Sequence, residues 1–181
     1  MQGREGRTIG FLGRSKSRAP EPDRSIIAAM TSKITVTEIH NPDAYMELLL
    51  KVDPSREKVK AYLAKSTCFV AILHDRIIGI CVLMQKDSRC FEIMNISVME
   101  EEQRKGIGTQ LLRHAILTCK TMGASKLEVG TGSFGYQLTF YQREGFRVHS
   151  IDKDFFLSEY DEPVLENGIQ LKDMLRLTLE L

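Results

Sequence analysis

The sequence predicts an α+β fold with a mixed, mostly antiparallel central sheet that is flanked by helices on both faces. Three observations lead to this fold class. Three apolar runs follow one another with short connections, the apolar period then changes to that of a helix, and the last residues alternate between leucine and polar residues. The predicted order is strand, two helices, three strands, helix, strand, helix and two strands.

The first elements are a short strand and two helices. Alternation of apolar and polar residues over 33–39 predicts the strand. Asn41-Pro42-Asp43 joins a capping side chain, a proline suited to the first helical position and an acid in the first turn, so it predicts a helix start. Asp53-Pro54 repeats this signal and is expected to open the second helix.

An antiparallel meander follows. The break at His74-Asp75-Arg76 turns the first run into the second, and a polar stretch leads from the second to the third. Such short connections between consecutive apolar runs favour antiparallel pairing. The three strands are predicted over residues 68–73, 77–84 and 90–98.

The second half alternates helices and strands. One face of the next helix is apolar and comprises Leu111, Leu112, Ala115, Ile116 and Cys119. Gly123 is expected to end this helix. The remaining elements are a strand over 126–130, a helix over 137–143, a strand over 146–151 and the alternating C-terminal strand over 175–181.

Composition and charge limit the classes of function. The chain has 181 residues, of which 43% are hydrophobic and 27% charged, which is typical of one globular domain. Its net charge of +1 provides no overall electrostatic attraction to nucleic acid or to a membrane surface. No apolar run approaches the roughly 20 residues that span a bilayer. We therefore expect a cytoplasmic protein without nucleic-acid or membrane partners.

The cysteines and histidines do not predict a metal site. No two cysteines form a C-x-x-C pair, and the histidines show no ligand spacing. Buried, reduced thiols are therefore expected at Cys68, Cys81, Cys90 and Cys119.

Residues 1–29 differ from the rest of the chain. They are rich in Arg, Gly, Ser and Pro, and they contain no long apolar region of the secretory type. This segment is expected to be a disordered or non-native N-terminal extension, with the domain spanning residues 30–181.

A charged turn with glycines connects the third meander strand to the next helix. The exposed amides and the dipole of a helix N-terminus bind anions, and glycine lets the main chain approach a phosphate closely. A Walker loop does not fit because Lys105 precedes Gly106, and a Rossmann fingerprint does not fit because no third glycine follows Gly108. An ordinary tight turn is the alternative to an anion site.

Two motifs resemble hallmarks of the GNAT acetyltransferase superfamily. Gln103-Arg-Lys-Gly-Ile-Gly108 is similar to its (Q/R)-x-x-G-x-(G/A) signature, and Leu138-Thr-Phe-Tyr-Gln-Arg-Glu-Gly-Phe146 is similar to its helix ending in F-Y-x-x-x-G-F. The motifs occur in the family's order, and the resemblance covers residues 30–181. Residues 130–138 also look similar to a bacterial subgroup of the superfamily.

The resemblance implies an acetyl-CoA-dependent N-acetyltransferase with acetyl-CoA as its co-substrate. It implies that the backbone of Ile96, Ser97 and Val98 pairs with the pantetheine arm like an added strand. Gln137 is expected along the channel of the cofactor. The same resemblance puts the pyrophosphate on the amides of Gln103, Arg104, Lys105, Gly106, Ile107, Gly108 and Thr109.

Proton removal from the amine is the main chemical obstacle in acetyl transfer. A lysine-like amine has a pKa of about 10.4, so its neutral form at pH 7 carries a penalty of roughly 4 to 5 kcal/mol. The departing thiolate is easier to accommodate: its thiol has a pKa of about 8.5, so the ionised form at pH 7 carries a penalty of only roughly 2 kcal/mol. A base near the acceptor therefore matters more than an acid at the sulfur.

Glu92 and Tyr141 are the candidate catalytic residues. Glu92 lies in an otherwise apolar strand, where a carboxylate is unfavourable unless it is paired or functional, and many GNAT enzymes carry a catalytic Glu there. An ion pair or a solvated strand face is the alternative. Tyr141 matches the family's tyrosine that approaches the CoA sulfur, and aromatic packing with Phe140 and Phe146 is its alternative.

Three functions remain open from the sequence. The chain is expected to acetylate a small-molecule or peptide amine, and a GNAT fold that holds acyl-CoA without turnover is the second reading. The third is an unrelated α+β nucleotide binder. The acceptor would be shaped by residues 41–65 and by the loop over 150–170, and the alternating C-terminal strand suggests a homodimer.

Overall fold

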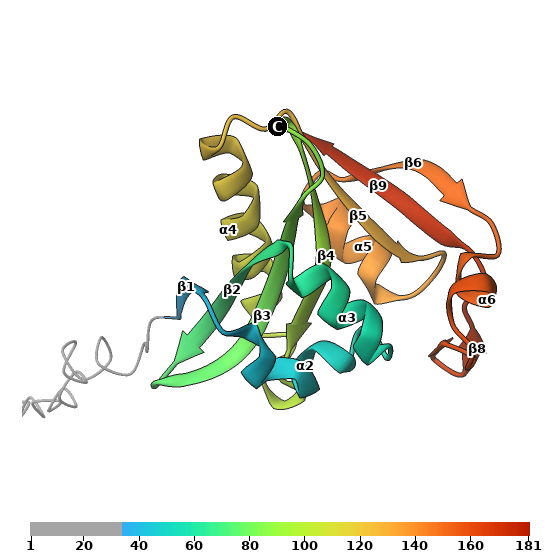
Figure 1. Ribbon diagram of the computed structural model, residues 1–181, viewed down its shortest axis with the longest axis horizontal. Helices are drawn as coiled ribbons and strands as arrows, with labels where there is room; N and C mark the ends of the chain where they lie inside the picture. The colour runs from blue at the N-terminus through green and yellow to red at the C-terminus, as the bar shows by residue number, and fades with distance from the viewer. Residues whose placement is uncertain (1–33) are drawn as a thin grey trace, which may run out of the picture. The chain divides into compact units, whose positions relative to one another are not determined.

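A seven-stranded sheet organises the part of the chain that the computed structural model describes, residues 34–181 (Figure 1). Its order is β1-β2-β3-β4-β5-β9-β6, and only β4 and β5 pair in parallel. In chain order the strands are β1 (Thr35–Ile39), β2 (Ser66–Leu73), β3 (Arg76–Gln85), β4 (Cys90–Val98), β5 (Lys126–Gly132), β6 (Arg147–Asp152) and β9 (Met174–Glu180). The expectations for residues 1–29 lie outside the described residues.

Helices cover both faces of this sheet, as predicted (Figure 1). α4 (Ile107–Thr121) and α5 (Tyr136–Arg143) lie on one face, and α2 (Met46–Leu50) and α3 (Arg56–Leu63) on the other. Two further turns of 3-10 helix are η1 (Pro42–Tyr45) and η2 (Glu100–Glu102). We call the two sides the α4 face and the α3 face.

The strands of the meander are buried on both sides because each has apolar residues at both its even and its odd positions. In β2, Phe69 and Ala71 pack in the apolar cluster of the α4 face, whereas Cys68 and Val70 pack in the cluster of the α3 face. Successive side chains of a strand point to opposite faces, so a continuous apolar run serves both layers. The predicted meander of β2, β3 and β4 is confirmed.

The second helix begins later than predicted. Asp53-Pro54 does not open it; α3 begins at Arg56, and Ser55 caps it by accepting a hydrogen bond from the Lys58 amide at 3.3 Å. Asp53 instead accepts a hydrogen bond from the Ser55 amide at 3.0 Å. The helix-start signal is therefore genuine, but the proline belongs to the turn before the cap.

The C-terminal strand is not an open edge. β9 pairs with β5 on one side and with β6 on the other, so the strand pairing with a second copy that its alternating leucines suggested cannot occur. The segment expected as a loop over 150–170 also contains structure, namely α6 (Phe155–Glu159) and a hairpin of β7 (Leu165–Glu166) and β8 (Ile169–Gln170). Within residues 34–181, no helix combines the length and the apolar character needed to cross a membrane.

Candidate active site

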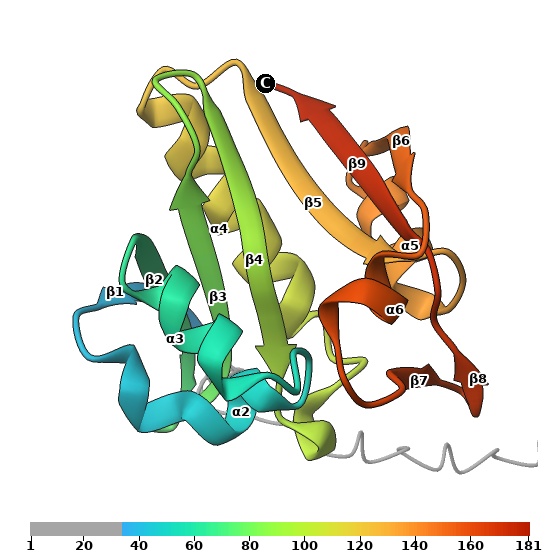
Figure 2. The ribbon, with the colours of Figure 1, turned by 45° about the vertical axis from the view of Figure 1, so that its right-hand side comes forward.

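β4 and β5 stop pairing in the middle of the sheet. Their pairing covers only Cys90–Ile93 and Lys126–Val129, although β4 continues to Val98 and β5 to Gly132. Figure 2 shows the two strands diverging from this point. Beyond Ile93, β4 is paired with β3 alone, so the main chain of Ile96, Ser97 and Val98 has one edge without a strand partner. This is the edge to which the resemblance assigned the pantetheine arm.

The turn after β4 presents amides without acceptors. Gly106 adopts a left-handed conformation with φ of 82°, and the helix α4 begins at the next residue. This change of hand turns successive amides toward one point, which is a known anion-binding geometry. In the described part of the chain, no group accepts a hydrogen bond from the amides of Ile107, Gly108 or Thr109.

Side chains of the turn stabilise its conformation through contacts within the turn and with β4. Gln103 Nε2 donates to the Val98 carbonyl oxygen at 3.2 Å, which ties the turn to the end of β4. Lys105 Nζ lies 3.0 Å from Glu102 Oε2, so its charge is partly compensated. Arg104 has a φ of 59°, which is unusual for a residue with a side chain.

Tyr141 combines aromatic burial with a free hydroxyl. It is 5% exposed and makes edge-to-face contacts with Phe140 and Phe146, at ring-centroid distances of 5.0 and 5.7 Å. Burial raises the pKa of Tyr141 well above its ordinary value. The hydroxyl is therefore neutral at ordinary pH, and among the described residues it has no hydrogen-bond partner.

Glu92 lies within a chain of charges of alternating sign. It is 8% exposed, its Oε1 is 2.9 Å from Arg176 Nη1, and its Oε2 is 3.4 Å from Lys86 Nζ. The ion pair is the alternative that the sequence left open for Glu92, and its role as a base stays a prediction. In spatial order the chain of charges is Asp152, Arg176, Glu92, Lys86, Glu128 and Lys126.

Gly130 makes the contact between Arg176 and Glu92 possible. Arg176 on β9 is paired with Gly130 on β5, and β5 separates β9 from β4. A Cβ at residue 130 would lie 2.5 Å from Met174 Sδ and 3.2 Å from Arg176 Nη1. The missing side chain therefore leaves the space in which the guanidinium crosses β5.

Glu128 is held ionised by its lysine neighbours. Burial opposes its ionisation, but hydrogen bonds from Lys126 and Lys86 outweigh this effect and lower the pKa of Glu128 to about 2. The Lys86 Nζ atom lies 2.8 Å from Glu128 Oε2. Glu128 is thus ionised over the whole neutral range.

Asn95 and Tyr62 form a polar contact that the sequence did not predict. Asn95 Nδ2 donates to the Leu49 carbonyl oxygen and to Tyr62 Oη, each at 3.0 Å, while Asn95 Oδ1 is a buried atom without a partner. Burial raises the pKa of Tyr62 above its ordinary value. Tyr62 lies at an apolar position of its helix, so the sequence pattern identified it only as a core residue.

The segment that contains α6 is attached to α3 on the side of the sheet where Glu92 lies. Lys58 forms an ion pair with Glu159, and Tyr160 Oη donates to Asp53 Oδ1 at 3.3 Å. Burial raises the pKa of Asp53 despite hydrogen bonds from Ser55 and Tyr160. This bridge brings the two segments that were expected to shape the acceptor site together.

Gln137 lies at the exposed start of α5. Its Nε2 atom is 3.4 Å from Glu166 Oε2 of the β7–β8 hairpin, so the hairpin reaches the element that carries Tyr141. Its contact with the cofactor stays a prediction.

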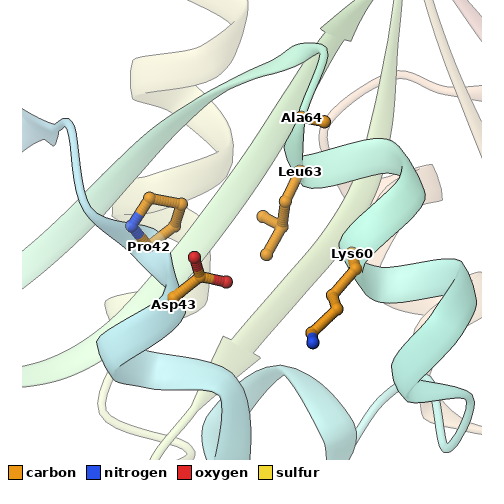
Figure 3. A pocket seen from close by; sticks show the side chains of 5 residues that line it. All are labelled: Pro42, Asp43, Lys60, Leu63 and Ala64. Carbon is orange, nitrogen blue, oxygen red and sulfur yellow. The ribbon is translucent and has the colours of Figure 1, made fainter.

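Two surface pockets lie away from the candidate site residues. A depression of about 400 Å³ lies between η1 and α3, and Figure 3 shows the side chains that line it. A groove of about 540 Å³ runs along α2 toward η2. Neither is lined by a residue that was predicted to bind the cofactor or to act in catalysis. The first is lined by Pro42, Asp43, Lys60, Leu63 and Ala64.

The four cysteines are buried free thiols, which confirms the expectation from the sequence. Burial raises the pKa of the Cys68 thiol to about 11. Over residues 34–181, no three His, Cys, Asp or Glu side chains are placed to hold a metal ion.

Known proteins resemble this chain over most of its length. A sequence model described as Acetyltransferase (GNAT) domain matches residues 64–148. The N-acetyltransferase YvbK of Bacillus subtilis is 45% identical over 150 residues, which cover 82% of this chain and 96% of the relative. The matched regions include the turn after β4 and Tyr141.

Two solved structures share both sequence and fold with the chain. IAA acetyltransferase from Bacillus cereus is 44% identical with a TM-score of 0.78, and the match covers 82% of this chain and 100% of that chain. A GNAT family acetyltransferase from Elizabethkingia anophelis, solved with acetyl-CoA bound, is 43% identical with a TM-score of 0.78 and coverages of 82% and 98%.

Proposed function

Because this chain belongs to the GNAT acetyltransferase family and is an N-acetyltransferase with acetyl-CoA as co-substrate, we propose that it acetylates the primary amine of a small molecule or peptide by direct attack. One observation carries the proposal: β4 has no β5 partner after Ile93, and it leads into a turn whose last amides have no acceptor among the described residues. A cofactor that needs one strand-like partner and one anion site finds both within the segment from Ile96 to Thr109.

In this proposal the pantetheine arm pairs with the open edge of Ile96, Ser97 and Val98. The diphosphate lies on the amides of the turn from Arg104 to Thr109, where the left-handed Gly106 directs them to one point. The Gln103 amide, which was also expected to bind it, instead donates to the Glu100 carbonyl oxygen at 3.2 Å. The α4 face carries both the start of α4 and Tyr141, so the donor is expected on that side of the sheet.

The amine nitrogen attacks the acetyl carbonyl carbon, the bond from carbon to sulfur breaks, and the sulfur departs as a thiolate. Glu92 takes the proton that the amine loses, directly or through one water. Its position supports this role, because Arg176 and Lys86 fix both carboxylate oxygens close to where β4 and β5 part. General base catalysis of this kind contributes roughly 10²- to 10⁴-fold.

As the thiolate departs, Tyr141 gives its hydroxyl proton to the sulfur and then regains a proton from the solvent. The support is its free, neutral hydroxyl among buried aromatic rings. A proton donor is needed less than a base here, because the ionised form of the thiol carries a penalty of only roughly 2 kcal/mol at pH 7.

A thiol-release assay with a panel of amines tests the proposal. The panel contains polyamines, aminoglycosides, amino acids and peptide N-termini, and steady release of coenzyme A is expected with at least one of them. Glu92→Gln should then lower kcat by roughly 10²- to 10⁴-fold while the Kd of acetyl-CoA, measured by calorimetry, stays within about twofold. Glu57→Gln, which changes an exposed acid of α3, is the matched control.

A different result would favour a non-catalytic binding module. Tight binding of coenzyme A without thiol release for any acceptor, together with an unchanged Glu92→Gln variant, would contradict the proposed reaction. An absence of heat on adding coenzyme A would contradict the assignment of the turn.

A further inference from the structure

Tyr62 carries a hydroxyl hydrogen for which the described part of the chain offers no acceptor. Asn95 Nδ2 donates to Leu49 O and to Tyr62 Oη, each at 3.0 Å. A side-chain amide nitrogen has two hydrogens, so these two bonds use both of them. Tyr62 Oη is therefore the acceptor in its contact with Asn95, and its own hydrogen points to another place.

The carbonyl of Leu49 fixes this arrangement. If the Asn95 amide were turned over, its oxygen would face the Leu49 oxygen at 3.0 Å, and two acceptors at that distance repel. The amide oxygen consequently points away from Leu49. Asn95 is 2% exposed, and within the described residues Oδ1 is the single buried side-chain nitrogen or oxygen without a partner. Such groups are destabilising, and they require an explanation when a protein retains them.

The Tyr62–Asn95 pair lies beside the proposed reaction centre. Asn95 follows the bulge of β4 and stands two positions beyond Ile93, the last residue that pairs with β5. Its side chain contacts α2 and α3, so it lies on the α3 face. Glu92 lies between Phe91 and Ile93, which pack on the α4 face, so Glu92 faces the same side as Asn95.

The unused hydrogen of Tyr62 calls for a ligand that brings an oxygen to it. A plain alkylamine or a polyamine offers no oxygen to the Tyr62 hydrogen, and it would leave that donor unpaired. An amine with an oxygen on the neighbouring carbon offers an acceptor to the Tyr62 hydrogen while its nitrogen lies toward Glu92, which faces the same side of the sheet. Donation from Asn95 also polarises the Tyr62 hydroxyl and makes it a stronger donor.

We propose that Tyr62 donates a hydrogen bond to an oxygen of the acceptor, and that the enzyme prefers amines with a hydroxyl or carbonyl on the adjacent carbon. Amino alcohols, amino acid amides and peptide N-termini belong to this class. The inference rests on the proposed function and adds the chemistry of the acceptor to it. Tyr62 is a specificity-determining residue in this scheme, whereas Glu92 and Tyr141 act on the reacting atoms.

Ethanolamine and propylamine test the inference because they differ only by a hydroxyl in place of a methyl group. The kcat/KM of each amine is compared between the wild type and Tyr62→Phe, so the basicity of each amine cancels. The loss is expected to be at least about 10-fold greater for ethanolamine than for propylamine, because a site built to bind a hydroxyl discriminates strongly. Tyr45 packs in the same apolar layer, and its hydroxyl has no partner among the described residues, so Tyr45→Phe should change the ratio less than about twofold.

Three results would overturn the inference. The wild type, corrected for the neutral fraction of each amine, could favour propylamine; Tyr62→Phe could lower both kcat/KM values equally; or Tyr45→Phe could produce the same selective loss. If Tyr62→Phe does not fold, as judged by its thermal transition, the wild-type preference alone decides.

A failure of the proposed function would give a different experimental result. A wild type that releases no thiol with any amine contradicts the acetyl transfer itself. Calorimetry of ethanolamine binding to the coenzyme A complex then decides the inference. Weaker binding by Tyr62→Phe supports it, and equal binding by both proteins rejects it.

Discussion

Arg176 and Glu92 are in contact across an intervening strand. Their side chains meet at 2.9 Å although β5 separates β9 from β4, and residue 130 of β5 has no side chain at the crossing point. The contact connects the C-terminal strand to the candidate base. A single backbone position therefore controls the surroundings of Glu92.

Gly130→Ala is expected to lower both stability and activity. The added methyl group would lie 2.5 Å from Met174 Sδ and 3.2 Å from Arg176 Nη1, so both side chains must move. Overpacking of this kind costs about 1 to 3 kcal/mol, and the flexible ends of Met174 and Arg176 favour the lower value. Denaturant unfolding measures the loss, and kcat should fall because Glu92 loses its fixed partner. Wild-type stability together with wild-type kcat would show that the crossing is unimportant.

Gly106 and Gly108 are expected to respond differently to alanine. Gly106 has a φ of 82°, so Gly106→Ala should cost roughly 1 to 2 kcal/mol and weaken coenzyme A binding by distorting the amides. Gly108 lies inside α4, and a methyl group there would meet Phe140 at an ordinary 3.6 Å. Gly108→Ala should therefore keep or raise the melting temperature and retain the cofactor, since the family signature also accepts alanine there. Calorimetry and thermal unfolding of both variants check the contrast, and equal behaviour would contradict it.

Tyr141 should impose no alkaline limit on the rate below about pH 10. Burial raises its pKa above the ordinary value of 10.0, so the hydroxyl stays protonated through that range. We expect Tyr141→Phe to lower kcat by roughly 10²-fold at neutral pH and to leave the Kd of acetyl-CoA nearly unchanged. The pH dependence of kcat checks this. A fall of the wild-type rate between pH 8 and 9 that is absent from Tyr141→Phe would be the opposite result.

Glu128 should stabilise the protein only where it is ionised. Its folded-state pKa of about 2 lies below the ordinary 4.5, so its contribution is present above about pH 4.5 and is lost as pH falls toward 2. Glu128→Gln should therefore be less stable than the wild type at pH 7, and the difference should shrink on acidification. Urea unfolding from pH 7 to pH 3 measures it. A difference that stays constant with pH would mean that packing, not charge, is responsible.

Local patterns of the sequence predicted the elements that build the cofactor site. The continuous apolar runs indicated β2, β3 and β4, and a single apolar face indicated α4. The turn between β4 and α4 was located because glycines, charges and a change of period occur together on adjacent residues. Each of these signals arises within one segment, so no knowledge of the tertiary arrangement was needed.

Contacts between distant segments were not predictable from such patterns. Tyr62 and Asn95 are 33 residues apart, and Glu92 and Arg176 are 84 residues apart. Alternating leucines identified β9 as a strand with one apolar face, but the same alternation suits an edge strand and an interior strand. The five-residue helix α6 is too short for a periodic pattern to reveal.

The parting of β4 and β5 opens the middle of the sheet toward both of its faces. Tyr141 lies with the α4 layer, while Glu92, Asn95 and Tyr62 lie with the α3 layer, so donor and acceptor would approach from opposite sides. Neither has to leave before the other arrives, and no acetylated enzyme has to form. The kinetic mechanism should accordingly pass through a ternary complex, with intersecting rather than parallel lines in double-reciprocal plots.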